Sequence, residues 1–303
     1  MSARILLCLV LLCRLACAET VYLMPVADTS LNEYFPSNNL GGLPFFNVGT
    51  SERSNYNRGL LRFDLTNAIP PGAKITRASL YIEILRVPQN GTPASSDFGL
   101  HRLLVPWGEG DKISPTNCTS CASEGSPATT NEATWTYRLA FTTNTWTIPG
   151  GAPTNDFIAT PSSSTTIYGI NGYDFASTPK TVADAQSWLD YPGSNFGWLM
   201  LCQSETTLYT ARRVGSREDP ENAPTLRVDY TPFRIENLIS GSNQIEFSFA
   251  VFTDRTYTVQ FRDVINSGGW QTLTQFAAPP SNMVFLVTDS LLSGQRFYRL
   301  MTP

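Results

Sequence analysis

The cationic side chains of this sequence are almost all arginines. Its 303 residues include 21 Lys and Arg, of which three are Lys. A planar guanidinium can donate two parallel hydrogen bonds to a carboxylate or sulfate group, so this bias suits recognition of an acidic ligand. It suits intramolecular pairs with Asp64, Glu218 or Asp219 equally well. We expect Arg62 and Arg217 to form such pairs. The candidate ligand-binding arginines are Arg53, Arg58, Arg212 and Arg213.

Aromatic side chains are the second ingredient of a carbohydrate site, because their faces stack on the C–H surfaces of sugar rings. Trp107 and Trp146 lie beside Gly and Pro residues that predict turns, and Tyr56 lies in the polar segment 54–57. These three residues are the candidate exposed platforms. The tryptophans assigned to a hydrophobic core are Trp188, Trp198 and Trp270.

Catalysis would need a positioned acid and base. Two acidic segments, 109–111 and 218–221, contain neighbouring carboxylates of the kind that hydrolyse glycosidic bonds. Both lie among Gly or Pro residues, which favours solvated loop charge. The single histidine, His101, would be the base of a lyase, but its surroundings favour an ordinary strand residue. We therefore predict that the protein is not an enzyme.

A structural calcium ion is the one cofactor that the sequence leaves open. Sandwich modules of extracellular proteins bind Ca²⁺ through Asp, Asn and backbone oxygens near strand ends. No EF-hand-like spacing is present. The local oxygen donors are Asp28, Asn38, Asn39 and Asp64.

Two cysteines, Cys118 and Cys121, lie close together in a polar stretch between strand-like regions. They suit a local disulfide, a redox pair or half of a metal site. A zinc site would need two more ligands, for which the chain offers Cys202 and His101. We favour a disulfide that staples the loop, as in exported proteins. Cys202 lies in an apolar run and is assigned to a buried strand.

The first 18 residues have the pattern of a cleaved secretory signal. Arg4 precedes an apolar run over 5–12, and Ala16-Cys17-Ala18 gives a small-residue ending. A lipoprotein signal ending at Cys17 is the alternative. No later stretch is apolar for about 20 residues, so we expect no membrane attachment after cleavage. The net charge of −4 argues against nucleic-acid binding. The chain is therefore predicted to be secreted, extracellular or at the cell surface.

Short apolar or alternating segments between Gly, Pro, Asn and Ser predict strands along the chain, as in an all-β sandwich or barrel. In the main part these strands are 20–24, 45–48, 60–65, 79–85, 99–105, 198–202, 208–214 and 225–230. Two shorter candidates, 133–139 and 145–148, lie in a loop-rich region. One helix is predicted over 181–189, ended by Pro192.

The spacing of the predicted strands changes after Pro232. Five strands are predicted there within about 70 residues, which is enough for a small second sandwich. These strands are 245–249, 256–262, 270–274, 284–288 and 295–301. The predicted organisation is a signal peptide at 1–18, a large β-sandwich at 19–232 and a smaller β-sandwich domain at 233–303.

Seven sequence segments come in the order seen in the DNRLRE family. They are ADTS (27–30), NNLGG (38–42), RGLLRFDL (58–65), PGAKITRASL (71–80), VPWGEG (105–110), EATW (132–135) and SRE (216–218). Residues 19–232 thus resemble a group of exported β-sandwich modules related to the disaggregatase repeat, some of which bind acidic polysaccharide such as alginate. The chain departs from that family by inserting 118–121 and a Ser/Thr-rich stretch. Residues 233–303 resemble small fibronectin-type or immunoglobulin-like modules.

These observations together predict a jelly-roll-like β-sandwich with a second, smaller β-sandwich domain. We expect a non-catalytic carbohydrate-binding or surface-adhesion protein that recognises an acidic polysaccharide, uronate-rich or sulfated. The alternative is a structural or protein-binding surface protein whose C-terminal domain docks a protein partner. A polysaccharide lyase or hydrolase is the third hypothesis.

Overall fold

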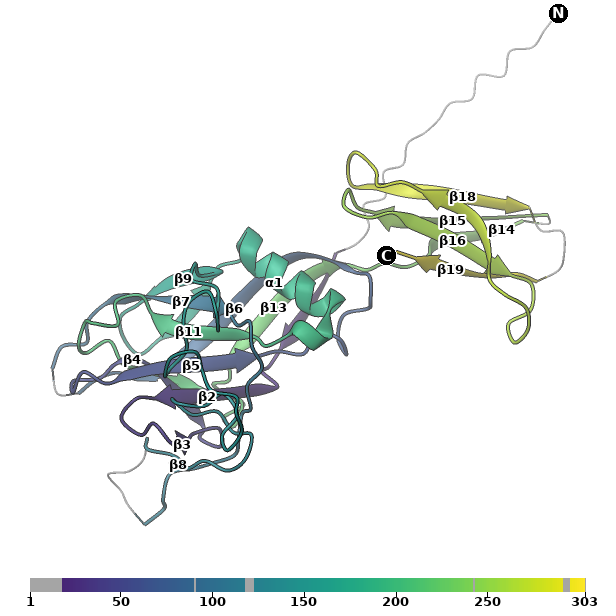
Figure 1. Cartoon of the computed structure of the whole chain (residues 1–303). Helices are drawn as coiled ribbons and strands as arrows, with labels where there is room; N and C mark the ends of the chain where they lie inside the picture. Colours follow the sequence, from purple (N-terminus) through teal and green to yellow (C-terminus); the bar gives the residue numbers. More distant parts are fainter. Residues whose placement is uncertain (1–17, 90, 118–122, 242, 291–294, 303) are drawn as a thin grey trace, which may run out of the picture. The chain divides into compact units, whose positions relative to one another are not determined.

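The computed structural model describes residues 18–302 except 90, 118–122, 242 and 291–294 (Figure 1). The predicted signal peptide and the pair Cys118 and Cys121 lie outside the described residues. The chain divides into two compact units. The large unit holds residues 20–71 and 75–230, and the small unit holds Glu19, Gly72–Lys74 and residues 231–302. Both are built from β-strands, which confirms the predicted fold class.

The described residues between 18 and 231 form thirteen strands and one α-helix. The strands are β1 (Glu19–Leu23), β2 (Ala27–Asn32), β3 (Asn38–Asn39), β4 (Phe45–Thr50), β5 (Tyr56–Arg62), β6 (Lys74–Arg86), β7 (Ser96–Arg102), β8 (Ser126–Pro127), β9 (Ser163–Ile167), β10 (Gly172–Phe175), β11 (Trp198–Cys202), β12 (Arg212–Gly215) and β13 (Thr225–Thr231). The helices are α1 (Pro179–Asp190) and the short 3₁₀ turn η2 (Pro192–Ser194).

Eleven of these strands form one curled sheet with the order β1-β13-β6-β12-β4-β5-β11-β7-β9, while β10 pairs with β6 and β2 pairs with β5. The pairs around the centre, β4 with β5 and β12 with both β4 and β6, are antiparallel. The sheet curls until its inner face encloses a core, so the large unit is a jelly-roll-like sandwich. Strands β3 and β8 form a separate short pair.

Buried and exposed residues alternate along β6, and this pattern determines which of its side chains face the core. Leu80, Ile82 and Ile84 are buried, whereas Tyr81 is exposed. Side chains alternate across a strand, so the three aliphatic residues share the inner face. The same pattern was expected for β5, yet Leu60 and Leu61 are both fully buried there. Both faces of β5 are therefore covered.

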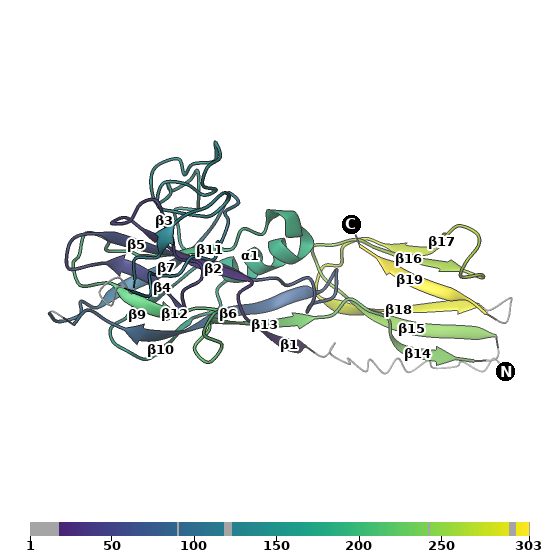
Figure 2. The same cartoon turned by 90° about the horizontal axis from the view of Figure 1, so that it is seen from below.

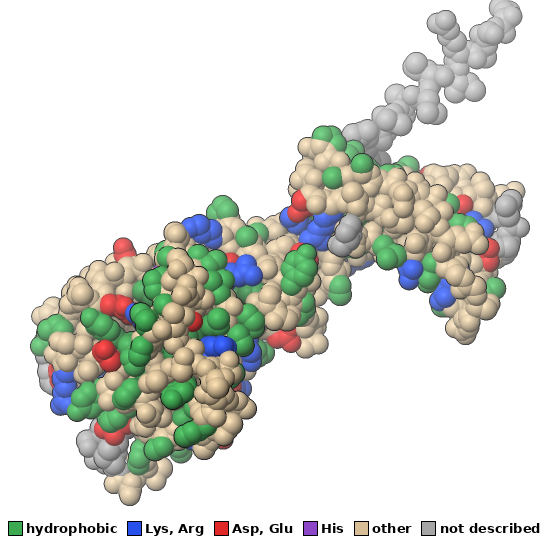
Figure 3. Space-filling model, in the orientation of Figure 1, with side chains coloured by type: hydrophobic (Ala, Val, Ile, Leu, Met, Phe, Trp, Pro, Cys, Tyr) green, Lys and Arg blue, Asp and Glu red, His purple; other side chains and the backbone are tan. Residues whose placement is uncertain are grey.

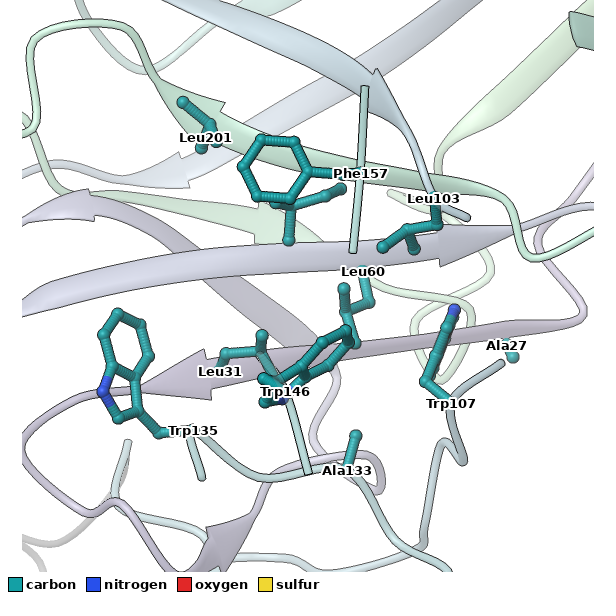
Figure 4. Packing of buried hydrophobic residues seen from close by; sticks show 11 residues of the cluster. Ala27, Leu31, Leu60, Leu103, Trp107, Ala133, Trp135, Trp146, Phe157 and Leu201 are labelled. Carbon is teal, nitrogen blue, oxygen red and sulfur yellow. The ribbon is translucent and has the colours of Figure 1, made fainter. Parts of the chain in front are cut away.

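The cover on the outer face of β5 comes from the long loops between β7 and β9. Trp107, Trp135 and Trp146 pack against Leu60 in a core cluster that also contains Ala27, Leu31, Leu103, Ala133, Phe157, Leu199 and Leu201 (Figure 4). The predicted strands 133–139 and 145–148 do not form, since the structure shows a single bridge between Tyr137 and Thr145 there. Turns fold this segment into a third layer over the sheet.

Helix α1 confirms the one predicted helix and ties together several strands (Figures 1 and 2). The Thr178 side chain caps its N-terminus. The Thr181 hydroxyl donates to the Ala78 carbonyl of β6, and the Trp198 indole of β11 donates to Asp184, both at 2.8 Å. Among the described residues, no helix is long and apolar enough to cross a membrane.

The small unit is a sandwich of two three-stranded sheets, ordered β14-β15-β18 and β17-β16-β19 (Figure 2). Its strands are β14 (Glu236–Ser240), β15 (Gln244–Val251), β16 (Tyr257–Arg262), β17 (Gln271–Phe276), β18 (Met283–Ser290) and β19 (Phe297–Met301). Phe247, Phe249, Tyr257 and Val259 are buried between the sheets. The second, smaller β-sandwich is thus confirmed.

Candidate functional site

The large unit contains an open cleft of about 450 Å³ where β4, β5 and β12 meet the loops beside them. Its walls come from the end of β2, the turn between β4 and β5, the end of β6 and the start of β12. Most of the side chains that line it are polar or aromatic. They include Asn32, Tyr34, Phe35, Asn47, Arg53, Asn55, Asn57, Arg86, Arg212 and Arg213.

Strand register builds the floor of this cleft. Arg213 of β12 lies directly opposite Asn47 of β4 on one side and Arg86 of β6 on the other. Directly opposed residues on neighbouring strands have side chains on the same face. Arg213 and Asn47 therefore share a face, and a shift of register between Arg213 and Val214 places Arg86 opposite Arg213 as well.

Arg213 is the most perturbed residue of the cleft. Its guanidinium carbon lies 3.7 Å from the centre of the Phe45 ring, and one of its terminal nitrogens donates to the Ser123 hydroxyl. Its Nε is buried and has no hydrogen-bond partner in the part of the chain that is described. Burial, and then the charge of Arg86, lower the pKa of Arg213 to about 10. The site therefore holds a partly desolvated cation that an anion would stabilise.

Two further arginines extend the positive charge along the cleft. Arg53 and Arg86 form no ion pair with any carboxylate of the described residues, and the Arg86 guanidinium donates only to Gln89. Glu52 and Glu124 are the acidic residues of the lining, so the cleft keeps a net positive charge. Figure 3 shows one face of the molecule, on which Lys and Arg side chains are scattered among Asp, Glu and hydrophobic side chains.

Polar and aromatic groups form the opposite wall. Asn32 of β2 lies opposite Asn57 of β5. The side-chain Oδ1 of Asn32 accepts hydrogen bonds from the backbone N–H groups of Tyr34 and Phe35, which fixes the loop that carries both rings. Tyr34 is 54% exposed and contacts Phe35 edge to face. An exposed tyrosine on a braced loop offers a face to a sugar ring.

Two of the four candidate arginines serve the fold instead of the cleft. Arg58 forms a two-point ion pair with Glu205 and also donates to the Gly150 and Gly151 carbonyls. Arg212 touches the cleft, but its guanidinium is buried and donates four hydrogen bonds to backbone carbonyl groups. Both arginines therefore make contacts within the protein, which is the alternative to ligand binding that the sequence left open. Arg53 and Arg213 line the cleft and stay candidate ligand-binding residues.

The expected aromatic platforms need correction. Trp107 is 4% exposed and Trp146 is 3% exposed. Each indole nitrogen donates to a backbone carbonyl, Trp107 to Phe196 and Trp146 to Thr134. Tyr56 is half-buried against the same cluster. The Gly and Pro residues beside these aromatics mark the turns that fold the loops over the sheet, and those turns bury the rings.

The expected pairings of Arg62 and Arg217 have different outcomes. Arg217 forms ion pairs with Glu109 at 2.6 Å and Glu218 at 3.1 Å, which confirms its structural assignment. Arg62 has no ion pair among the described residues, and its guanidinium lies 5.7 Å from the centre of the Trp107 ring. It covers the tryptophan cluster.

The expected calcium ligands do not come together. Asn39 donates to the Glu109 and Ala133 carbonyls, and Asn38 donates to the Glu124 carbonyl. Asp64 accepts hydrogen bonds within its own turn, and these lower its pKa. These three residues therefore brace loops, because their polar atoms already have protein partners.

Asp28 instead joins Glu109 and Glu218, whose carboxylate oxygens lie within 4.8 Å of its own. These three oxygens are the ones that could hold a cation here, and Arg217 already supplies one positive charge. Burial raises the pKa of Asp28 well above its usual range, and burial also raises that of Glu109. The sequence did not predict this cluster, because its three residues are far apart along the chain and Glu109 was assigned to a solvated loop.

The candidate catalytic side chains are likewise held by contacts within the protein or exposed to solvent. His101 is buried, with one ring nitrogen 2.9 Å from the Ile158 carbonyl and the other 3.0 Å from the Gln203 side chain. Burial lowers its pKa, which favours the neutral ring. Glu109 is held by Arg217, whereas Asp111 is 84% exposed. The buried thiol Cys202 lies 3.1 Å from the Ser96 hydroxyl.

Sequence reasoning missed four lining residues: Tyr34, Asn47, Asn57 and Arg86. The available signal was a polar residue between buried apolar neighbours in a strand, as at Asn47 between Phe46 and Val48. Their assembly depends on the order β6-β12-β4-β5, which brings together residues far apart in the sequence. No family model matches this chain, and no curated protein matches it.

Proposed function

We propose that this protein binds an acidic extracellular polysaccharide without catalysis, and that the cleft at β4, β5 and β12 is its binding site. Carboxylate or sulfate groups would occupy the space between Arg53, Arg86 and Arg213, while a sugar ring stacks on Tyr34. The asparagines of the opposite wall would bind hydroxyl groups. The charge, the donors and the exposed ring match what recognition of an acidic sugar requires.

The observation that carries this proposal is the partly buried Arg213 without a carboxylate partner among the described residues. Placing a cation where water is partly excluded costs free energy unless an anion or hydrogen-bond acceptors compensate it. Among the described residues, the neighbouring Arg212 has four carbonyl acceptors, whereas Arg213 has one hydroxyl acceptor. A bound uronate or sulfate group would supply the missing negative charge.

Secretion and family membership belong to the same proposal. The signal-like residues 1–18 support export, and the ordered segments between 27 and 218 support a DNRLRE-like module. An all-β sandwich is the architecture that this resemblance implies. On this reading the protein acts outside the cell or at its surface.

The test is affinity electrophoresis of the whole secreted chain in gels containing alginate, pectin, a sulfated galactan or neutral glucan, each with calcium or chelator. The variant Arg86→Gln/Arg213→Gln removes two cleft cations. Arg77→Gln is a control from an exposed position outside the cleft. We expect acidic glycans alone to retard the protein, with salt-sensitive affinity reduced at least about 10-fold in the double variant.

Two results would contradict the proposal. Equal retardation by neutral glucan would show that charge does not select the ligand. Unchanged binding of the double variant would show that an acidic glycan binds elsewhere. Release of reducing or unsaturated ends from the glycan would instead favour the lyase or hydrolase hypothesis.

Protein binding through the small unit is the second candidate function. Its outer strands expose large apolar side chains, of which Leu238, Ile239 and Leu286 are each more than 60% exposed. Surface apolar groups gathered on one unit are typical of protein contacts. Capture of a protein partner that is lost after Leu286→Ser, without any glycan binding, would favour this alternative.

A further inference from the structure

The small unit carries two arginines around one tryptophan. Arg262 ends β16, Arg299 lies in β19, and Trp270 directly precedes β17. Each guanidinium carbon lies 4.5 Å from the centre of the Trp270 ring. Strand pairing in the sheet β17-β16-β19 fixes the positions of Arg262 and Arg299, and Trp270 adjoins the first residue of β17.

These two arginines lack the ion pairs that neighbouring arginines have. Arg296 pairs with both Asp263 and Asp289, and Arg234 pairs with Glu236. Neither Arg262 nor Arg299 has a carboxylate partner among the described residues.

Both arginines make few hydrogen bonds within the part of the chain that the structure describes. Arg299 donates through Nε to the Gln260 side chain at 2.8 Å. The Nε of Arg262 is buried and has no hydrogen-bond partner in the described structure.

The arrangement leaves most of the guanidinium hydrogen-bonding capacity unused. A ring contact engages the flat face of a guanidinium, whereas its five N–H groups lie at the edge. Two cations that share one ring also repel each other, and an anion between or beside them would relieve that repulsion. Carboxylate and sulfate oxygens match the edge geometry of Arg.

We propose that Arg262, Arg299 and Trp270 form a second anion-binding site, separate from the cleft, for carboxylate or sulfate groups of a polysaccharide. The choice of a polysaccharide as ligand rests on the proposed function, whereas the anion preference rests on this cluster alone. Two sites on one chain would bind successive groups of the same polymer, and avidity would then exceed the affinity of either site.

Trp270 provides a specific reporter for this site. The other five tryptophans are buried, with exposed fractions of 7% or less, whereas Trp270 is half-buried. Iodide should therefore quench mainly Trp270 in the folded protein. The experiment measures iodide quenching of the whole secreted chain at constant ionic strength, with dextran sulfate, alginate oligosaccharides, neutral dextran or inorganic sulfate as probes.

We expect dextran sulfate or alginate to protect Trp270 from iodide, and neutral dextran to have no effect. The variant Arg262→Gln/Arg299→Gln should need at least about 10 times more polymer for the same protection. Arg234→Gln, which removes one charge from the same unit, is the control for general electrostatics, and Arg299→Gln alone serves if the double variant unfolds. Unchanged protection in both Arg299 variants would overturn the site. Equal protection by inorganic sulfate at the same charge concentration would overturn polymer recognition.

The cleft variant Arg86→Gln/Arg213→Gln separates this inference from the proposed function. If the cleft variant loses gel retardation but keeps Trp270 protection, both sites bind. If the cleft variant binds normally while the Arg262/Arg299 variant loses all binding, the cleft proposal fails and this site stands. If only the cleft variant loses binding and Trp270 is never protected, the second site fails.

Discussion

Replacement of Arg213 by methionine should separate stability from ligand binding. The pKa of Arg213 falls from its usual range to about 10 because the guanidinium is partly buried beside another cation. At about 1.4 kcal/mol per pKa unit, this corresponds to at most roughly 3 kcal/mol of destabilisation of the charged form. Partial solvent access and the contact with Phe45 offset part of it, which leaves a net cost of roughly 1 kcal/mol.

Methionine keeps an apolar contact with the Phe45 ring and removes the uncompensated charge. We expect Arg213→Met to leave the free energy of unfolding unchanged or to raise it by about 1 kcal/mol, while acidic glycan binding weakens at least about 10-fold. Arg212→Met is the matched comparison. It would leave four carbonyl acceptors without their donor and should cost about 2 to 4 kcal/mol.

Urea unfolding of the free protein, followed by circular dichroism, measures both differences under identical conditions. Affinity electrophoresis in alginate gels, run well below the melting temperature, measures binding. If Arg213→Met destabilised the protein as strongly as Arg212→Met, Arg213 would be a structural residue. The argument from its missing counter-ion would then be refuted.

Three further predictions concern residues outside the cleft. Arg217→Ala should lower the free energy of unfolding by about 2 kcal/mol at pH 7, a value that allows for the partial exposure of the ion pair. Burial raises the pKa values of Asp28 and Glu109, so stability is lost as the pH rises through these pKa values. Unfolding measured at pH 4 and at pH 7 should therefore show a larger destabilisation of the variant at pH 7. Millimolar Ca²⁺ should raise the melting temperature of this variant more than that of the wild type, since it replaces the lost cation, and an equal rise would argue against calcium here. Trp146→Ala should cost about 3 kcal/mol or more in urea unfolding, with glycan retention at low temperature unchanged. Cys202 should react with a maleimide only in denaturant, as mass spectrometry would show; rapid labelling of native protein would contradict its burial.

Hydrophobic patterning predicted the strands whose inner faces are apolar. The segment 198–202 is β11 with identical bounds, and the predicted strand 225–230 is β13 to within one residue. Hydrophobic patterning did not predict strand β2, because Asp28, Thr29 and Ser30 are polar although each is buried. Hydrogen bonds from other segments compensate the burial of Asp28 and Ser30, which accept from the Arg217 and Asn47 backbone, whereas the Thr29 hydroxyl has no partner among the described residues. Such partners come from distant sequence and cannot be read from local alternation.

The tryptophans illustrate a second limit of local reasoning. Gly and Pro next to Trp107 correctly indicated turns, but a turn does not determine whether its side chains face solvent. The packing around Gly150 shows why the tryptophan side chains are buried. A Cβ atom at Gly150 would lie 2.5 Å from the Trp135 ring, and the residue has a φ of 83°. The loops fold so tightly over the sheet that they create a core of their own.

This second core explains where the large unit can bind a ligand. The loop layer with Trp107, Trp135 and Trp146 covers the outer face of β5 and β11, so Arg58 at that face is drawn into contacts with the loop carbonyls of Gly150 and Gly151. Strand β12 lies two strands beyond β5 in the sheet. Its Arg213 lies beside the short turns around 51–55 and 86–89 and contacts the loops between β7 and β9 only through Ser123 among the described residues, and these segments leave an open cleft. Arg58 and Arg213 thus acquire different roles from the strand on which each lies.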